Sequence, residues 1–366
     1  MIAKVVEEIA NAVLYEGYML YPYRPSSVKN RQRWNFGVLY PKAYSQAQNG
    51  NDGCFMQTEC LASGGASAGV NIKVRFLQAV TRTVARADTE RDASTTETDG
   101  IQGSDFSAVQ SLEVDGRIFQ AWQEAMECEI ALRMFCIGDQ EFARQSSSHS
   151  FPGGREVEPV RSADGKVSGI IVRTKESIST EIGVGVTRLE DELYKITVRI
   201  SNTSAAAAPT SDFEHRDASD RDDALKQSLL SAHTILTIEG GEFVSLIDPG
   251  AALKDFAAGC QNVGTWPVLA GEEGQRNSLL SSPIILYDYP QIAPESPGDL
   301  FDGCEIDEIL ALRILTLTED EKKEMRDADE RSRQILERTE SMPAEHFMKL
   351  HGVLRGLRPS DEERHE

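Results

Sequence analysis

Residues 69–84 have the sequence GVNIKVRFLQAVTRTV, and the first half of this stretch decides the fold class. Between residues 70 and 76, apolar side chains alternate with polar ones, which is the period of a strand with one buried and one wet face. Residues 193–200 (LYKITVRI) repeat the alternation, and residues 170–173 (IIVR) suit another strand. Further strands are expected at 34–40 and 130–137, and a helix suits 119–127. The pattern predicts antiparallel sheets.

Two glycine-containing stretches indicate turns in this β-rich region. Residues 234–238 and 243–247 are strand-like and flank Glu239-Gly240-Gly241-Glu242. Two central glycines between strands are typical of a hairpin, which we therefore expect here. Residues 64–69 (GGASAG) lack the Lys-Ser/Thr ending of a phosphate-binding loop, so a flexible hairpin loop is the better interpretation.

Helices are predicted mainly near the two ends of the chain. The expected helices are residues 3–14, 224–231, 305–312, 319–340 and 344–354. Thr318 and Glu321 have the spacing of a capping box, in which the hydroxyl and the carboxylate satisfy free backbone N–H groups. The helix at 319–340 has few apolar residues. We expect it to lie on the surface, or to complete a core only when it binds a partner.

The resulting fold class is α+β, a largely antiparallel β-sandwich-like body followed by a C-terminal helical segment. Three regions are predicted. Residues 1–200 form a β-rich domain with an inserted mobile loop near 88–106, residues 221–290 a second β-rich lobe with one helix, and residues 291–366 a helical region.

Composition restricts the function classes. The 366 residues include 59 acidic and 38 basic ones, a net charge of −21 that repels nucleic-acid phosphates and anionic lipid headgroups. The sequence contains no apolar run of about 18 residues, so membrane insertion is not expected. Acidic residues interrupt the start of the chain where a signal peptide needs an apolar stretch. We expect a cytoplasmic protein whose six thinly scattered cysteines are reduced.

Catalytic motifs give little support for an enzyme. The sequence contains neither a His-Glu-x-x-His zinc motif nor a Gly-x-Ser-x-Gly nucleophile elbow. Cys54 and Cys60 would need the distant Cys128 and Cys136 to complete a zinc site, so tolerated or buried thiols are the simpler interpretation. The sequence identifies no cofactor, and a non-enzymatic protein is favoured.

The densest polar cluster lies at residues 288–308, where seven carboxylates occur within 21 residues. The candidate site residues are Asp288, Glu295, Asp299, Asp302 and Glu305. Three interpretations stay open. The residues cap the following helix and face water, they contact a basic protein partner, or they bind a hard cation through oxygen ligands.

A basic and aromatic patch near the N-terminus has a charge opposite to that of the carboxylate cluster at 288–308. Its candidate residues are Tyr21, Tyr23, Arg24, Arg31, Arg33 and Trp34. Four cations are too few to indicate nucleic-acid binding in a chain of charge −21. We expect the patch to pair with residues 288–308 inside the fold.

Three stretches also carry a family resemblance. Residues 14–41 (LYEGYMLYPYRPSSVKNRQRWNFGVLYP), 264–269 (GTWPVL) and 281–310 (SSPIILYDYPQIAPESPGDLFDGCEIDEIL) resemble a family of uncharacterised bacterial proteins encoded beside uptake nickel-iron hydrogenase genes. Residues 312–329 (LRILTLTEDEKKEMRDAD) extend the resemblance, and residues 45–220 match less specifically.

The resemblance implies a non-enzymatic accessory or maturation factor for a cytoplasmic nickel-iron hydrogenase, through its genomic company rather than through known chemistry. Residues 288–308 and the helix at 319–340 would then be presented to a hydrogenase subunit or a maturation factor. The alternative is a metal-binding protein or metal-dependent enzyme that uses the carboxylate cluster.

Overall fold

A computed structural model describes the chain over residues 4–20, 23–25, 27, 30, 33–48, 52–91, 105–139, 144–205, 218–292, 298, 300 and 307–343. The helices are α1 (Lys4–Tyr15), α2 (Lys42–Ala47), α3 (Ala218–Lys226), α4 (Lys254–Ala258), α5 (Asp307–Leu315), α6 (Glu319–Ala328) and α7 (Glu330–Glu340). The strands are β1 (Phe55–Arg91), β2 (Phe106–Val109), β3 (Ser111–Val114), β4 (Arg117–Gln120), β5 (Trp122–Ala131), β6 (Phe135–Cys136), β7 (Arg144–Phe151), β8 (Gly154–Arg161), β9 (Val167–Lys175), β10 (Ile178–Glu190), β11 (Leu193–Asn202), β12 (Leu230–Val244), β13 (Trp266–Leu269) and β14 (Ser278–Ser282). The strands pair antiparallel and the last helices follow them, so the predicted α+β class is confirmed.

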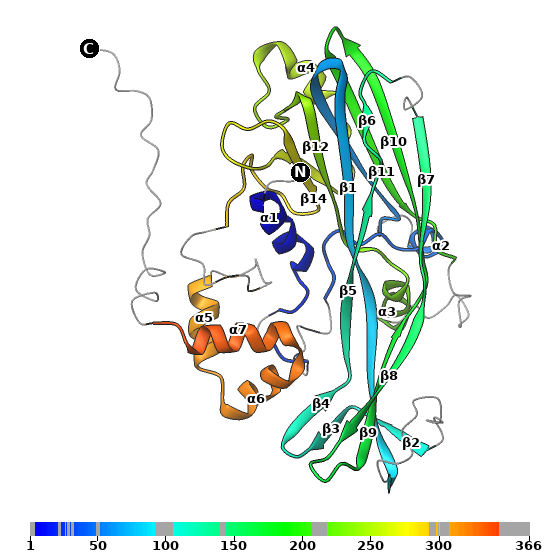
Figure 1. Ribbon diagram of the computed structural model, residues 1–366, viewed down its shortest axis with the longest axis vertical. Coiled ribbons are helices and arrows are strands. Elements are labelled where there is room, and N and C mark those ends of the chain that lie inside the picture. Colours follow the sequence, from blue (N-terminus) through cyan, green and yellow to red (C-terminus); the bar gives the residue numbers. More distant parts are fainter. Residues whose placement is uncertain are drawn as a thin grey trace.

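The 37-residue strand β1 is the spine of the large sheet (Figure 1). Its first arm, residues 55–63, pairs with β11. β12 pairs with the end of this arm from Leu61 and with the second arm from Gly69 to Leu77. Its second arm, residues 69–91, pairs further along with β5 and then with β9. β1 therefore belongs to one sheet with strands from both of the β-rich regions predicted above.

The two arms of β1 meet at a bend and not at a hairpin turn. A Cβ atom built at Gly64 would lie 3.3 Å from the Ala68 Cβ, whereas residues four apart in a straight strand are separated by about 13 Å. The same Cβ would lie 2.9 Å from the Gly241 Cα of β12, so only glycine allows the two strands to approach here. The arms do not pair with each other in the described ladders, and Figure 1 shows β1 turning over at the upper end of the sheet.

β12 bends at the same place. Gly240 has a φ of +75°, which L-residues with a side chain rarely adopt. Both halves of β12 pair with β1, from Leu230 through Val244, on either side of this bend. The hairpin predicted between 234–238 and 243–247 is therefore wrong, because the two glycines form a corner within one strand. Such corners let a strand pass from one layer of a sandwich to the other.

The main core lies between the layers that this corner creates. Met56, Cys60 and Ala62 from the first arm of β1 belong to the same buried cluster as Val70 to Phe76 from the second arm. Phe76 also contacts Phe151 of β7 edge to face, with ring centres 5.0 Å apart. The alternation that predicted a strand at 69–84 thus correctly identified its buried face.

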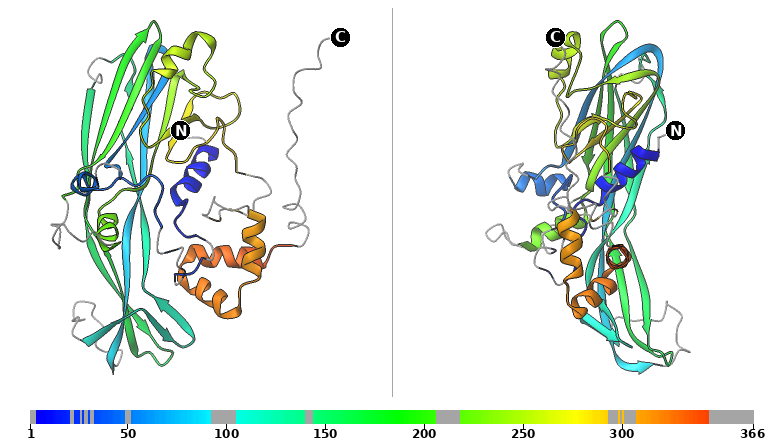
Figure 2. Two further views of the ribbon diagram at one scale, coloured as in Figure 1. Left: turned by 180° about the vertical axis from the view of Figure 1, so that it is seen from behind. Right: turned by 90° about the vertical axis from the view of Figure 1, so that its left-hand side faces the viewer.

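A second core joins the two ends of the chain. Leu14, Tyr18 and Trp34 from the N-terminal segment pack with Met325 of α6 and Leu336 of α7. Figure 2 shows these C-terminal helices gathered beside the sheet. The helix predicted at 319–340 is two helices that break at Asp329, and its apolar residues are buried within the chain instead of being presented to a partner.

Several other predicted elements differ from the structure. The strand expected at 34–40 is reduced to a single bridge between Leu39 and Leu229. The helix expected at 119–127 is wrong, because β4 pairs there with β3 and β5 pairs with β1. The helix expected at 224–231 is α3, which ends at Lys226. β1 extends into the loop predicted near 88–106, and residues 92–104 and 344–354 lie outside the described residues. None of the described helices is long and apolar enough to cross a membrane.

Candidate functional site

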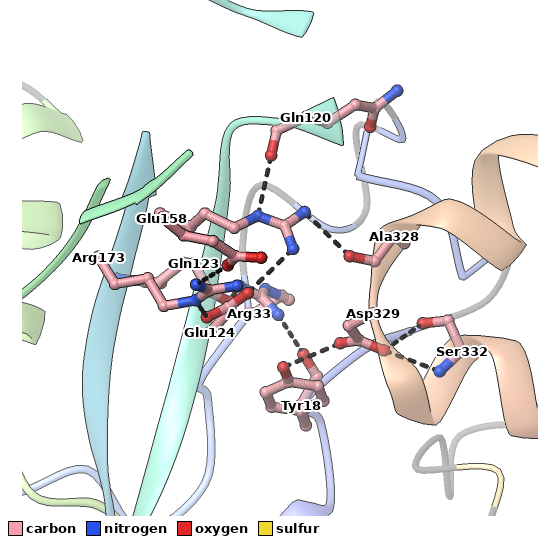
Figure 3. Close-up of polar contacts among 11 residues, drawn as sticks. Tyr18, Arg33, Gln120, Gln123, Glu124, Glu158, Arg173, Ala328, Asp329 and Ser332 are labelled. Carbon is pink, nitrogen blue, oxygen red and sulfur yellow. Dashed lines mark hydrogen bonds and ion pairs between the residues drawn. The ribbon is translucent and has the colours of Figure 1, made fainter. Parts of the chain in front are cut away.

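Arg33, from the predicted basic patch, is buried at a junction of three segments (Figure 3). Its guanidinium donates hydrogen bonds to the backbone oxygens of Tyr18 and Gln123, and it lies 3.7 Å from the centre of the Trp122 ring. Burial lowers the pKa of Arg33 to about 10, against the opposing effect of Tyr18 and Asp329. A cation held by carbonyl oxygens and an aromatic face joins parts of the chain, and it stays charged at neutral pH.

Trp34 and Tyr23 lie in the second core, together with Tyr18 and Trp122 beside Arg33. The indole Nε1 of Trp34 donates to Oε1 of Gln123 over 2.7 Å. Tyr23 is completely buried. Tyr21 and Arg31, the other members of the predicted patch, lie outside the described residues.

Arg24 pairs with a different acidic segment from the one expected. Its guanidinium lies 3.0 Å from a carboxylate oxygen of Glu321 and 3.7 Å from one of Glu324, both on α6. The sequence predicted that the basic patch would pair with residues 288–308. For Arg24 that prediction is wrong, because the second core brings the N-terminal segment against α6.

Asp329 joins the N-terminal segment to the break between α6 and α7 (Figure 3). Its carboxylate accepts a hydrogen bond from the Tyr18 hydroxyl at 2.9 Å and caps α7 by accepting from the Ser332 backbone N–H at 2.8 Å. Burial, and then the charge of Asp329, raises the pKa of Tyr18 far above its usual range. The phenol therefore stays protonated and acts as a donor.

Ion pairs continue from this junction across the sheet. Arg82 donates to the backbone oxygen of Ala328 and to Oε1 of Glu124, each over 2.9 Å. Arg173 donates to the other oxygen of Glu124 over 2.8 Å and to Glu158 over 2.6 Å. Each of these four charged groups has an oppositely charged partner, so charge-assisted hydrogen bonds stabilise the junction.

Sequence reasoning missed this junction as a unit. Arg82 and Glu124 are 42 residues apart, and only the register of β1 with β5 brings them together. A local signal existed for Asp329 alone, because an aspartate three residues before Ser332 matches a helix N-cap.

Asp288 is the one of the five candidate site residues in the predicted carboxylate cluster that the structure describes. Its Oδ2 accepts from Ser245 Oγ at 2.5 Å, and its Oδ1 accepts from the Leu269 backbone N–H at 2.8 Å. The two oxygens thus fix the loop after β14 against Ser245 at the end of β12 and against β13. The remaining candidates, which lie outside the described residues, are Glu295, Asp299, Asp302 and Glu305.

Buried thiols and imidazole do not form a reactive site. Burial raises the pKa of Cys128 to about 11 and that of Cys60 still further. A thiol that remains protonated is a poor nucleophile and a poor metal ligand. Burial also lowers the pKa of His233 to about 4, so its ring is neutral at pH 7. Within the described part of the chain, no three His, Cys, Asp or Glu residues are grouped to hold a metal ion.

Large apolar side chains are exposed around β13, β14 and the loops beside them. We call this surface the apolar rim, and its members are Ile247, Val263, Trp266, Ile285, Tyr287 and Ile292. Tyr287 is 82% exposed and Ile285 is 71% exposed. Large apolar side chains with this much exposure recur in the segments from Ile247 to Ile292, and such side chains are frequent in contact surfaces.

The local structure explains why the rim points outward. Ile284 and Leu286 pack inward against the cluster beneath α1, so the residues that alternate with them, Ile285 and Tyr287, face solvent. The bond between Asp288 and Ser245 holds Tyr287 close to the segment that carries Ile247. This bond therefore joins the two segments that carry Tyr287 and Ile247.

Fold and site together define an α+β protein with a bent antiparallel sheet, an N-terminal segment packed against the C-terminal helices, and exposed apolar side chains around β13 and β14. No model of a known protein family matches the chain, and no curated protein matches it.

Proposed function

We propose that this chain is a non-enzymatic accessory or assembly factor that acts through protein–protein contacts, and that its partner is a subunit or maturation factor of a cytoplasmic nickel-iron hydrogenase. The apolar rim is the observation that supports a role in protein contact. The choice of partner rests on the family resemblance of residues 14–41, 264–269 and 281–310.

Four of the six rim residues lie within the stretches that carry this resemblance. Trp266 belongs to residues 264–269, and Ile285 and Tyr287 belong to residues 281–310. Residues that resemble a family and are also exposed and apolar cannot be explained by core packing alone. Aromatic and aliphatic anchors of this kind supply much of the binding energy in protein interfaces.

The alternative, a metal site built on residues 288–308, gains no support from Asp288. A carboxylate that accepts hydrogen bonds from Ser245 Oγ and Leu269 N uses one lone pair on each oxygen to stabilise its loop. That geometry accounts for an aspartate at this position without a cation.

The test is affinity purification of the tagged chain from its native host under hydrogenase-expressing conditions, with metal analysis of the eluted material. We expect stoichiometric hydrogenase subunits or maturation proteins and no stoichiometric metal. A chain that elutes alone with about one metal ion would overturn the proposal and favour the alternative.

A matched pair of variants locates the contact. Ile285→Ser/Tyr287→Ser alters the rim, and Met134→Ser/Leu312→Ser removes two apolar side chains that are also exposed but lie elsewhere. The free energy of unfolding of both variants should lie within about 0.5 kcal/mol of the wild-type value, because all four side chains are at the surface. Only the first should lose the hydrogenase proteins. Equal loss in both, or in neither, would contradict a role for the rim.

A further inference from the structure

β7 is an open edge of the large sheet. It is the terminal strand in the order of the sheet and pairs with β10 in unbroken register from Phe151 with Ile178 to Arg144 with Gly185. Figures 1 and 2 both show β7 at the margin of the molecule. Among the described residues, no backbone group of β7 bonds to anything on its outer side. Half of its N–H and C=O groups therefore point outward.

The edge strands β8, β13 and β5 have features that block strand pairing. β8, which continues the same margin, contains Pro159, four charged residues and a register shift at Val160. β13 is four residues long, and its Leu269 bonds to Asp288 and Tyr289 on the outer side. The edge of β5 is acidic, and Arg33 bonds to one of its carbonyls. Proline, charge and cover are the usual means by which proteins protect a sheet edge.

Residues 145–150 of β7 have none of these features. The sequence of residues 145–150 is QSSSHS, without proline, lysine, glutamate or aspartate, and Ser146, Ser148 and Ser150 are exposed. The ladder to β10 shows no bulge that would twist this edge away. Its small polar side chains leave the backbone accessible to another strand.

We propose that β7 pairs antiparallel with β7 of a second copy of this chain, so that two sheets become one continuous sheet across a two-fold axis. Outward N–H and C=O groups occur at every second residue, so the axis must pass through a residue and not between two. An axis at Ser148 sets Ser148 against itself and Ser147 against His149. An axis at Ser147 sets Ser146 against Ser148. Neither register places like charges opposite each other at pH 7.

The net charge of the chain predicts how a β7–β7 dimer should respond to salt. Each copy carries −21, so long-range repulsion opposes association, while the strands that meet are uncharged over residues 145–150. Salt screens the repulsion, with a Debye length of about 8 Å at 0.15 M, and leaves backbone hydrogen bonds nearly unchanged. The dimer should therefore strengthen as salt rises, the opposite of an interface held by ion pairs.

The experiment is sedimentation velocity of the purified full chain from about 1 to 200 μM, a range suited to the weak association expected of a small interface. We expect a monomer–dimer equilibrium whose dissociation constant falls by at least about threefold between 0.05 and 0.5 M NaCl. A monomer at every concentration and salt would overturn the proposal, and would leave the edge to a strand from another protein.

Variants at the axis provide the specific test. Ser148→Lys should abolish the dimer in either register, because the two lysines face each other with the axis at Ser148 and are diagonal neighbours about 7–8 Å apart with the axis at Ser147. Ser148→Glu should do the same. An equimolar mixture of the two should form a heterodimer. Ser111→Lys, on the exposed edge of β3, is the matched control and should dimerise like the wild type. A dimer that persists in Ser148→Lys, or single variants that stay monomeric without recovery on mixing, would refute pairing through β7. This test uses one purified protein, so it is independent of any hydrogenase partner.

Discussion

Replacing Arg33 by methionine tests whether the buried junction stabilises the fold. Methionine keeps most of the apolar stem but removes both hydrogen bonds, to Tyr18 O and Gln123 O, and the contact with the Trp122 ring. Hydrogen bonds from a charged donor contribute about 1.5–3 kcal/mol each, and a desolvated cation–π contact contributes about 1–2 kcal/mol. The lost interactions amount to about 6 kcal/mol.

An opposing effect reduces this loss. Burial lowers the pKa of Arg33 to about 10, and a shift of this size corresponds to roughly 3 kcal/mol of unfavourable desolvation that methionine relieves. The net expected decrease in the free energy of unfolding is about 2–3 kcal/mol. Urea titration followed by tryptophan fluorescence is the assay, because Trp34 and Trp122 both lie beside Arg33.

The control is Arg117→Met, since Arg117 makes an exposed contact with the Phe119 ring at 5.1 Å. It should change the free energy of unfolding by less than about 0.5 kcal/mol. An Arg33→Met protein as stable as the wild type would show that desolvation cancels the contacts, and the junction would then confer specificity without net stability.

Three further predictions concern the same packing. His233 has a pKa of about 4 in the folded chain, below the 6.5 of an unfolded histidine. The free energy of unfolding should therefore be constant above pH 6.5 and fall by about 3 kcal/mol as the pH drops towards 4. Urea titrations should show a weaker pH dependence of this free energy in His233→Asn, and an equal pH dependence would contradict a buried neutral His233. Leu336→Ala should destabilise the chain by about 2–5 kcal/mol, because Leu336 is fully buried in the second core, whereas Leu312→Ala at an exposed position of α5 should cost far less; thermal unfolding compares them, and equal effects would argue against burial of α7. Asp329→Ala and Tyr18→Phe should show a coupling of about 1 kcal/mol in a double-mutant cycle, because each removes the same 2.9 Å hydrogen bond; additive effects would mean that this bond contributes nothing.

Local patterns predicted the strands better than their connections. The alternation at residues 69–84 and 193–200 identified strands and buried faces, because a sheet with one covered face imposes a period of two. The capping box at Thr318 was confirmed, since all its bonds are made within four residues. The glycines at 240 and 241 satisfied a hairpin pattern equally well, and only the pairing of both halves with β1 distinguishes a corner from a turn.

The candidate site was less accessible from sequence for the same reason. Arg24 carried a clear charge signal, but its partner on α6 was fixed by packing between chain ends some 300 residues apart. The apolar rim has no sequence motif. Ile285 and Ile284 are the same residue type, and only the direction of the backbone makes one exposed and the other packed.

The burial of α6 and α7 changes where a protein partner is to be sought. A helix with few apolar residues suggested a surface that completes its core on binding, but Met325 and Leu336 complete that core with Leu14 and Tyr18 of the same chain. Releasing those helices for a partner would require breaking the Tyr18–Asp329 and Arg82–Ala328 bonds and exposing the second core. Binding at the rim requires neither, because its side chains are already in water. A partner that needs no rearrangement of the chain is therefore expected to bind the end of the sheet at β13 and β14, and not the C-terminal helices.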